Sequence, residues 1–262
     1  MMTRIFVASF NRASDGALKH LIKTLKKRGI YTNYHPEADY ILACGDRTET
    51  FDFVLERFRE NKKIIHLWAG EISQGTHDEV YRHAMTLMSM IQLCTNDRAV
   101  YRVVALCRAV DKKPNIHVVG NVMLDDMTVD ESKVPDYFYD LVLYNPPTVL
   151  TESEIMKEII EITEIVEDPY YWIEPNGDMH SDLLKDYVNT KNLPRSQFLG
   201  MIKNCRKFIT NSSCQYYEAP FLISKEKIIP IGKRNASRES KFADMTMTGA
   251  TEKIIKILER LT

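Results

Sequence analysis

The chain has 262 residues, enough for one large or two smaller domains with a sizeable core. Its 35 Lys and Arg residues against 36 Asp and Glu residues leave a net charge of -1, so no overall field indicates a nucleic-acid or membrane partner. The five cysteines form no C-x-x-C pair, which argues against a disulfide framework or a zinc site, and no apolar run is long enough to span a membrane. We therefore expect a cytoplasmic protein that requires no metal cofactor.

In the first half, short apolar strands alternate with amphipathic helices, as is typical of a parallel sheet with crossover helices. The predicted strands are Arg4–Ser9, Asp39–Cys44, Lys63–Leu67, Ile91–Cys94 and Asn115–Val119. The predicted helices are Asp15–Lys27, Glu49–Arg59, Asp78–Met90 and Arg98–Arg108. The charged segment Thr128–Asp136 has no periodicity and predicts a linker between two domains.

The second half repeats this alternation. Its predicted strands are Tyr139–Tyr144, Tyr170–Ile173, Lys207–Thr210 and Ile228–Ile231. Its predicted helices are Thr151–Glu167, Ser181–Val188, Pro194–Cys205, one that begins after Asn211, and Thr248–Leu261. The sequence therefore predicts an α/β fold of two doubly wound, Rossmann-like domains facing a cleft. The first comprises residues 1–127, joined by the C-terminal helix at 246–262, and the second comprises residues 128–245.

The turn after Lys207–Thr210 has the composition of an anion site. Ser212, Ser213 and Cys214 place backbone N–H groups and two hydroxyls at the start of a predicted helix, where unpaired donors favour a phosphate. Further along that helix, Glu218 could accept a hydrogen bond from a sugar hydroxyl. The alternative is an ordinary N-cap by Asn211 or Ser212, with Glu218 as a solvated helix residue.

Five segments at or near the ends of predicted strands together carry a family resemblance. They are Leu42-Ala-Cys-Gly-Asp-Arg-Thr-Glu-Thr50, His66-Leu-Trp-Ala-Gly70, Asp78-Glu-Val-Tyr-Arg82, Val119-Gly-Asn-Val-Met-Leu-Asp125 and Thr210-Asn-Ser-Ser-Cys-Gln-Tyr-Tyr-Glu-Ala219. In order and spacing they resemble the hydrolysing UDP-N-acetylglucosamine 2-epimerase family. The resemblance spans nearly the whole chain and implies the GT-B architecture, which that family shares with many glycosyltransferases.

For the nucleotide, the resemblance implies that Ser212 holds the UDP diphosphate and that Glu218 binds the ribose. Ser213 and Cys214 stand where the family has two glycines, so the approach of the backbone to the phosphate differs. Arg12 resembles the family's arginine after the first strand, with a surface arginine as the alternative. Asn145, followed by Pro146, replaces a His-Arg pair and is included in the expected UDP site.

The catalytic side of the resemblance is less complete. Asp46 and the Asp78-Glu79 pair match the family's acidic positions, but Trp68 occupies the place of a glutamate. Since an indole cannot accept a proton, this change alters the chemistry. Glu71, three residues further on, could restore a carboxylate, with a surface glutamate as the alternative. His66 lies within an apolar strand and is expected to be a hydrogen-bonded structural residue.

The retained nucleotide turn and the altered catalytic positions favour a UDP-sugar-dependent glycosyltransferase. In this hypothesis Asp46, Glu79 or Glu71 deprotonates an acceptor hydroxyl, and backbone N–H groups at Ser212–Cys214 stabilise the leaving diphosphate without a metal. Trp68 forms a wall for the substrate or, alternatively, part of the core. The competing hypotheses are a divergent UDP-N-acetylglucosamine 2-epimerase and a non-catalytic nucleotide-sugar-binding protein.

The acceptor of such a transferase is not evident from the sequence. Two basic clusters could contact the phosphates of a DNA acceptor, although solvated helix ends are the usual explanation of such clusters. The clusters are Lys19, Lys23, Lys26, Lys27 and Arg28, and Lys233, Arg234, Arg238 and Lys241. The expected partners are therefore a UDP-sugar and an unknown acceptor, with no membrane, and a homodimer is left open.

Overall fold

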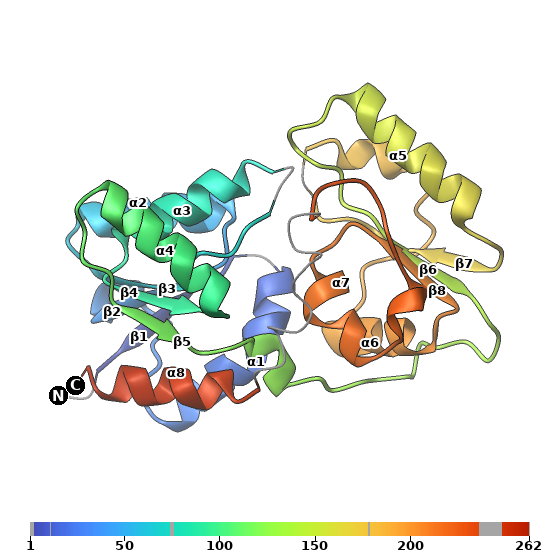
Figure 1. The fold of residues 1–262 in the computed structure, drawn as a ribbon. Coiled ribbons are helices and arrows are strands. Elements are labelled where there is room, and N and C mark those ends of the chain that lie inside the picture. Colours follow the sequence, from blue (N-terminus) through green and yellow to red (C-terminus); the bar gives the residue numbers. More distant parts are fainter. Residues whose placement is uncertain (1–2, 11, 74–75, 178, 236–247, 262) are drawn as a thin grey trace. The chain divides into compact units, whose positions relative to one another are not determined.

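The computed structural model describes residues 3–10, 12–73, 76–177, 179–235 and 248–261 (Figure 1). The chain divides into two compact units. The first unit comprises Met1–Ile72, Asp78–Asp126 and Lys241–Thr262, and the second unit comprises Ser73–His77 and Met127–Ser240. Each unit has its own parallel sheet, which confirms the prediction of a two-domain α/β fold.

The first unit is built on a five-stranded parallel sheet with the order β1-β2-β3-β4-β5. Its strands are β1 (Ile5–Ala8), β2 (Tyr40–Cys44), β3 (Lys63–Leu67), β4 (Ile91–Cys94) and β5 (Ile116–Val118). Helices cover both faces of this sheet, so its central strands are largely buried and mostly apolar rather than alternating. All five residues of β2 are buried, for example.

Five α-helices flank this sheet: α1 (Arg12–Lys27), α2 (Thr48–Arg59), α3 (Asp78–Met88), α4 (Asp97–Ala109) and α8 (Ala250–Glu259). Helices α2, α3 and α4 lie on one face, and α1 and α8 lie on the other (Figure 1). Two 3-10 turns, η1 (His35–Glu37) and η2 (Val122–Asp125), complete the unit. The carboxylate of Asp125 caps α8 by accepting from the N–H groups of Gly249 at 2.7 Å and Thr251 at 2.6 Å.

A short backbone pairing explains why α1 lies opposite the other crossover helices. The segment after α1 pairs in parallel with the outer edge of β1 through an isolated bridge between Ile5 and Tyr31. Ile5 N donates to Ile30 O at 2.7 Å, and Thr32 N donates to Ile5 O at 2.9 Å. The chain then crosses the opposite face to reach β2. The chain therefore adds backbone to both sides of β1: first the segment after α1 on the outer side, and then β2 on the inner side. This is how a doubly wound sheet is built.

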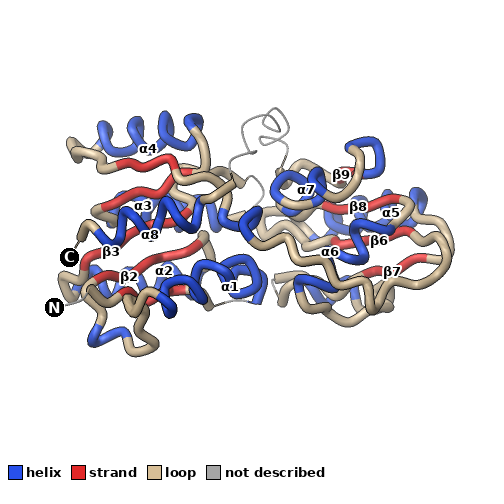
Figure 2. Tube along the Cα trace, turned by 90° about the horizontal axis from the view of Figure 1, so that it is seen from below, coloured by secondary structure: helices blue, strands red, loops and turns tan. Residues whose placement is uncertain are grey.

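The second unit has a four-stranded parallel sheet in the order β7-β6-β8-β9, which can be followed in Figure 2. Its strands are β6 (Asp140–Leu143), β7 (Tyr170–Trp172), β8 (Lys207–Thr210) and β9 (Ile228–Pro230). From β6 the chain moves to β7 on one side and returns to β8 on the other. The direction of winding thus reverses between β6 and β8, and ligands of open α/β sheets bind beside the carboxyl ends at such a point.

The helices of the second unit again cover both faces of its sheet. Helix α5 (Glu152–Ile165) packs on one face through Ile155, Ile159 and Ile162, and it begins with a capping box formed by Thr151 and Glu154. Helices α6 (Arg195–Asn204) and α7 (Cys214–Tyr217) cover the other face. The remaining 3-10 turns are η3 (Ser181–Leu184), η4 (Ala219–Phe221) and η5 (Lys225–Lys227).

Two predicted helices of this unit are shorter than their patterns indicated. The predicted helix Ser181–Val188 is reduced to η3, because so short a segment does not offset the cost of starting an α-helix. The predicted helix after Asn211 has only one turn, α7. Pro220 lacks an N–H donor and disfavours helical backbone at Ala219, so the chain leaves the α-conformation at Glu218.

No helix in the described part of the chain is long and apolar enough to cross a membrane. Within the same residues, no group of three or more His, Cys, Asp or Glu side chains is arranged to hold a metal ion.

Candidate functional site

In the second unit, the carboxyl ends of β6 and β8 are joined by two asparagines. Asn145 N donates to Asn211 Oδ1 at 2.9 Å, and Asn211 Nδ2 donates to Asn145 O at 2.8 Å. Both residues are buried, and Asn235 Nδ2 donates to Asn211 O at 2.6 Å. This arrangement fixes the backbone at the point where the direction of winding reverses.

Asn145 therefore has a structural role in addition to its predicted place in the site. Its Oδ1 accepts from Asn176 N at 3.0 Å, and its carbonyl oxygen also accepts from Arg234 Nη1 at 2.9 Å. No described residue accepts a hydrogen bond from its Nδ2. This atom is also not one of the described polar atoms that are buried without a partner, so it is accessible to solvent. One amide donor of Asn145 is thus available to a ligand, and the Arg234 guanidinium lies beside it.

The predicted anion turn follows directly. Ser212 N donates to Thr210 Oγ1 at 2.9 Å, and Cys214 N makes a long hydrogen bond of 3.4 Å to Ser212 Oγ. Ser213 is the N-cap residue of α7 and makes no side-chain cap, whereas Ser212, which the capping alternative named, accepts from Cys214 N at the start of α7. The Ser213 N–H donates to no described residue. The Cys214 thiol is buried, which raises its pKa to about 12, so only its backbone can serve a ligand.

Glu218 lies at the other end of α7 and is buried, not solvated as the alternative prediction required. Its Oε1 accepts from Arg195 Nε at 2.7 Å, and Arg195 is the first residue of α6. Burial raises the pKa of the Glu218 carboxyl, and the Arg195 guanidinium opposes that rise.

In the first unit, Arg82 brings two of the predicted catalytic carboxylates together. From α3 its guanidinium forms ion pairs with Asp46, which follows β2, and with Glu79 Oε2 at 2.9 Å. Only 4% of the Arg82 side chain is exposed, against 22% for Asp46 and 29% for Glu79. Glu79 Oε1 also lies 2.9 Å from His83 Nε2. Asp46, Arg82, Glu79 and His83 are thus linked in a row of side-chain contacts at the carboxyl end of β2.

His66 supports this region from inside the sheet. It is fully buried, with Nδ1 at 3.0 Å from Thr86 Oγ1 and Nε2 at 3.0 Å from the carbonyl oxygen of Gly45. Burial lowers the pKa of His66 to about 4, so the imidazole is neutral near pH 7. The prediction of a hydrogen-bonded structural histidine is confirmed, and the residue it holds directly precedes Asp46.

Trp68 and Glu71 form a tight turn after β3. Trp68 has a φ of 66°, and Glu71 N donates to Trp68 O at 3.3 Å. The indole is partly buried and packs against the core of the first unit. Glu71 is 5% exposed, and the Asn96 amide lies 3.5 Å from its carboxylate, so the alternative of a surface glutamate is wrong. Gly70, between them, lies so close to α4 that an added Cβ would meet Ala99 O at 2.3 Å.

One predicted site residue lies outside the described side chains, and two important residues were not predicted. The Arg12 side chain lies outside the described part of the structure. Arg82 and Arg195 were missed as partners of the acidic residues. Arg82 stands one helical turn after Glu79, a spacing that could have revealed it. Arg195 is far from Glu218 in sequence, so no local pattern identifies it.

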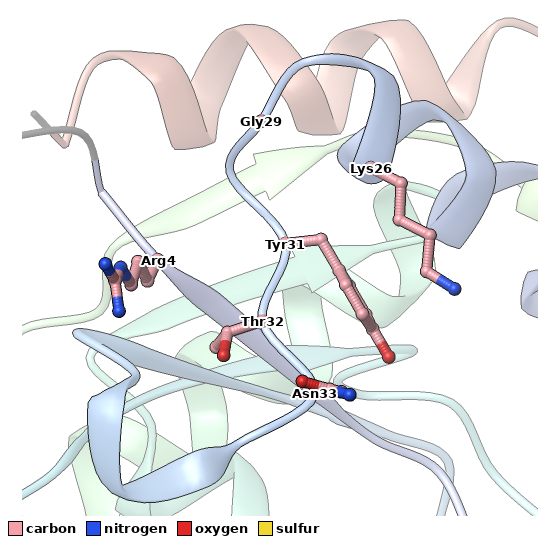
Figure 3. Close-up of a pocket in the computed structure, with 6 residues that line it drawn as sticks. All are labelled: Arg4, Lys26, Gly29, Tyr31, Thr32 and Asn33. Carbon is pink, nitrogen blue, oxygen red and sulfur yellow. The ribbon is translucent and has the colours of Figure 1, made fainter.

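A cavity of about 490 Å³ lies away from these strand ends (Figure 3). It is lined by Arg4, Lys26, Gly29, Tyr31, Thr32 and Asn33, which surround the start of β1 and the segment after α1. Since none of the predicted site residues lines it, this cavity is separate from the candidate site.

Each unit has a parallel sheet with acidic, amide or small polar residues at the carboxyl ends of its strands. This arrangement is typical of nucleotide-binding α/β folds. The family model described as UDP-N-acetylglucosamine 2-epimerase matches residues 10–262, and this chain belongs to that family.

Individual relatives are more distant. The chain is 26% identical over 225 residues to UDP-N-acetylglucosamine 2-epimerase of Neisseria meningitidis serogroup B, covering 77% of this chain and 58% of that protein. It is 26% identical over 226 residues to the hydrolysing UDP-N,N'-diacetylbacillosamine 2-epimerase of Legionella pneumophila, with the same coverage of 77% and 58%. The chain therefore spans less than two thirds of the length of these curated relatives.

Solved structures resemble the fold. A UDP-GlcNAc 2-epimerase from Neisseria meningitidis, bound to UDP-GlcNAc, has a TM-score of 0.68 at 12% identity and covers 99% of each chain. A UDP-GlcNAc 2-epimerase from Methanocaldococcus jannaschii, in complex with UDP-GlcNAc and UDP, has a TM-score of 0.59 at 18% identity, covering 96% of this chain and 82% of that chain.

These comparisons correct the leading functional hypothesis from the sequence. The glycosyltransferase hypothesis is wrong, because the family match and the curated relatives are 2-epimerases. The error came from treating Trp68 and Asn145 as signs of a new reaction class, whereas substitutions within a retained fold do not define one. The predicted homodimer, DNA contact and cytoplasmic location stay predictions.

Proposed function

We propose that this chain binds a UDP-N-acetylhexosamine and epimerises it at C2, by the hydrolysing type of reaction. The observation that carries the proposal is the family match over residues 10–262, together with a second-unit site in which Ser213 N–H and Asn145 Nδ2 remain open to a ligand. In the proposal these donors hold the diphosphate, and Glu218 accepts from the ribose. The fold is similar to that of structures that contain UDP-GlcNAc, which supports binding of a UDP-sugar by this chain.

For the chemistry, the proposal assigns proton transfer at C2 to the carboxylates of the first unit. The hydrolysing reaction requires removal of the C2 proton as the bond from C1 to UDP breaks, and then addition of water at C1 with delivery of a proton to the opposite face of C2. Asp46 and Glu79 are partly exposed, so a bound substrate can reach them, and their ion pairs with Arg82 fix the orientation of both carboxylates. Glu71 is a further candidate, because its buried carboxylate lies in the same turn as Trp68.

Incubation with UDP-GlcNAc in D2O tests the proposal directly. Solvent deuterium should appear at C2 of the sugar, together with free ManNAc or UDP-ManNAc and UDP, as followed by NMR and mass spectrometry. Asp46→Asn should reduce this incorporation by at least about tenfold, the scale typical of acid–base catalysts. Binding of UDP without any deuterium at C2 would contradict the epimerase proposal.

A specific set of contacts favours a second candidate, a nucleotide-sugar-binding protein without turnover. Trp68 cannot accept a proton, and Arg82 forms ion pairs with two of the carboxylates. Asn145, which stands where the family has a titrating side chain, is held by four hydrogen bonds. This candidate predicts UDP-sugar affinity with no turnover, and no loss of affinity in Asp46→Asn.

A further inference from the structure

Arg195 and Glu218 form an ion pair within the second unit. Arg195 Nε donates to Glu218 Oε1 at 2.7 Å, and only 17% and 10% of the two side chains are exposed. The Arg195 guanidinium also contacts Met127 Sδ at 3.6 Å. Because both partners are packed, this charge-assisted hydrogen bond fixes the direction in which the carboxylate points.

The ion pair uses only one of the two carboxylate oxygens. No described residue donates to Glu218 Oε2. This atom is also not one of the described polar atoms that are buried without a partner, so it is accessible to solvent. Since each oxygen of an ionised carboxylate can accept about two hydrogen bonds, Oε2 is open to hydroxyl groups of a ligand.

The position of Glu218 relative to the anion turn suits a nucleotide. Ser213 and Glu218 lie at opposite ends of the one-turn helix α7. The helical rise over this interval is about 7 Å. This span is comparable to that between the diphosphate and the ribose hydroxyls of a single nucleotide.

We propose that Arg195 is a positioning residue, which holds Glu218 turned so that Oε2 accepts hydrogen bonds from the ribose hydroxyls of a bound uridine nucleotide. This inference rests on the nucleotide site proposed above. It adds that the preference for a nucleotide with ribose hydroxyls over one without them depends on Arg195, a residue of α6 that is distant from Glu218 in sequence.

Electrostatics supports the geometric argument. Burial raises the pKa of Glu218, and Arg195 is the charged group that opposes the rise. The Cys214 thiol also faces this carboxylate, but burial raises its pKa to about 12, so it is uncharged near neutral pH. Without Arg195, a larger fraction of Glu218 is protonated near neutral pH, and the protonated carboxyl is a weaker acceptor.

The test is calorimetric binding of UDP and of 2′,3′-dideoxy-UDP to the whole chain. The wild type should bind UDP at least about tenfold more tightly, because the dideoxy compound cannot donate to the carboxylate. Arg195→Met should reduce this ratio to below about threefold near neutral pH and recover part of it as the pH is raised, because burial raises the pKa of Glu218 and the opposing guanidinium is gone. Arg195→Lys retains the charge and should keep most of the ratio.

Arg206→Met is the matched control, since Arg206 forms a 2.7 Å pair with the buried Asp140 at the amino end of β6. It should lower stability and leave the UDP to dideoxy-UDP ratio unchanged. If Arg195→Met weakens both nucleotides equally, Arg195 only supports the fold and the inference is wrong. A wild type that binds neither nucleotide contradicts the proposed site itself, and a wild type that binds both equally contradicts only the contact of Glu218 with the ribose.

Discussion

Asn145 and Asn211 join the carboxyl ends of β6 and β8 through two reciprocal hydrogen bonds, of 2.9 and 2.8 Å. Each bond pairs a side-chain amide of Asn211 with the backbone of Asn145, and both residues are buried. The direction of winding reverses between these strands. The two bonds therefore hold the backbone at Asn145 and at the Ser212–Cys214 turn, which belong to the proposed nucleotide site.

Asn211→Ala should therefore lower stability as well as ligand affinity. It leaves the buried Asn145 N without an acceptor, at a cost of about 2 kcal/mol. The melting temperature should fall by roughly 4–8 °C. Asn211→Asp keeps the acceptor for Asn145 N but replaces the donor to Asn145 O with a buried carboxylate oxygen, so it should also lower stability. Asn204→Ala, at an exposed asparagine, is the control and should change the melting temperature little. An unchanged melting temperature in Asn211→Ala would show that the two bonds contribute nothing.

Arg82→Met should abolish most of the proposed turnover, because it removes the cation between Asp46 and Glu79. The two carboxylates then repel each other, and stability should fall by about 1–3 kcal/mol. Arg82→Lys should retain part of both properties. Deuterium incorporation at C2 and urea unfolding measure the two effects separately.

Arg57 provides the control for Arg82. It is also a buried arginine with two carboxylate partners, Glu56 and Glu60, each at 2.9 Å. It lies near the end of α2, remote from the carboxyl end of β2. Arg57→Met should lower stability by a similar amount without changing the rate per folded molecule. Equal losses of rate in both variants would mean that Arg82 acts only through stability.

Ser213→Asp should weaken UDP binding by at least about tenfold, because a carboxylate beside the anion turn repels the diphosphate. Ser213→Ala should have little effect, since the predicted contact is the backbone N–H, which this change retains. Ser213 is only partly buried, so both variants should fold. Calorimetry with UDP distinguishes them, and equal affinities in the two variants would mean that the diphosphate binds elsewhere.

The sequence predicted the order of strands and helices, because the parallel strands are buried on both faces and their apolar runs are unambiguous. The strands Lys63–Leu67, Ile91–Cys94 and Lys207–Thr210 have the predicted bounds. The one-turn length of α7 was missed, because a helical pattern continues past Glu218 in the sequence and only Pro220 indicates the stop.

The partners of the acidic side chains could not be predicted in the same way. Arg195 meets Glu218 only because α6 and α7 cover the same face of one sheet, and no local periodicity records that contact. The burial of Glu71 likewise depends on α4, whose N-cap residue Asn96 lies beside it. Strand-end motifs therefore locate a site, while tertiary packing decides which of its charges are paired.

His66 should make stability depend on pH. Burial lowers its pKa to about 4 from an ordinary value near 6.5, so the unfolded chain takes up a proton that the folded chain does not. This contribution is present in full above about pH 6.5 and is lost as the pH falls toward about 4. It amounts to about 3 kcal/mol. His66→Gln retains an amide donor for Gly45 O and should flatten the dependence. Urea unfolding of both proteins between about pH 4.5 and 7.5 measures the difference, and parallel curves would show that His66 does not titrate differently in the two states.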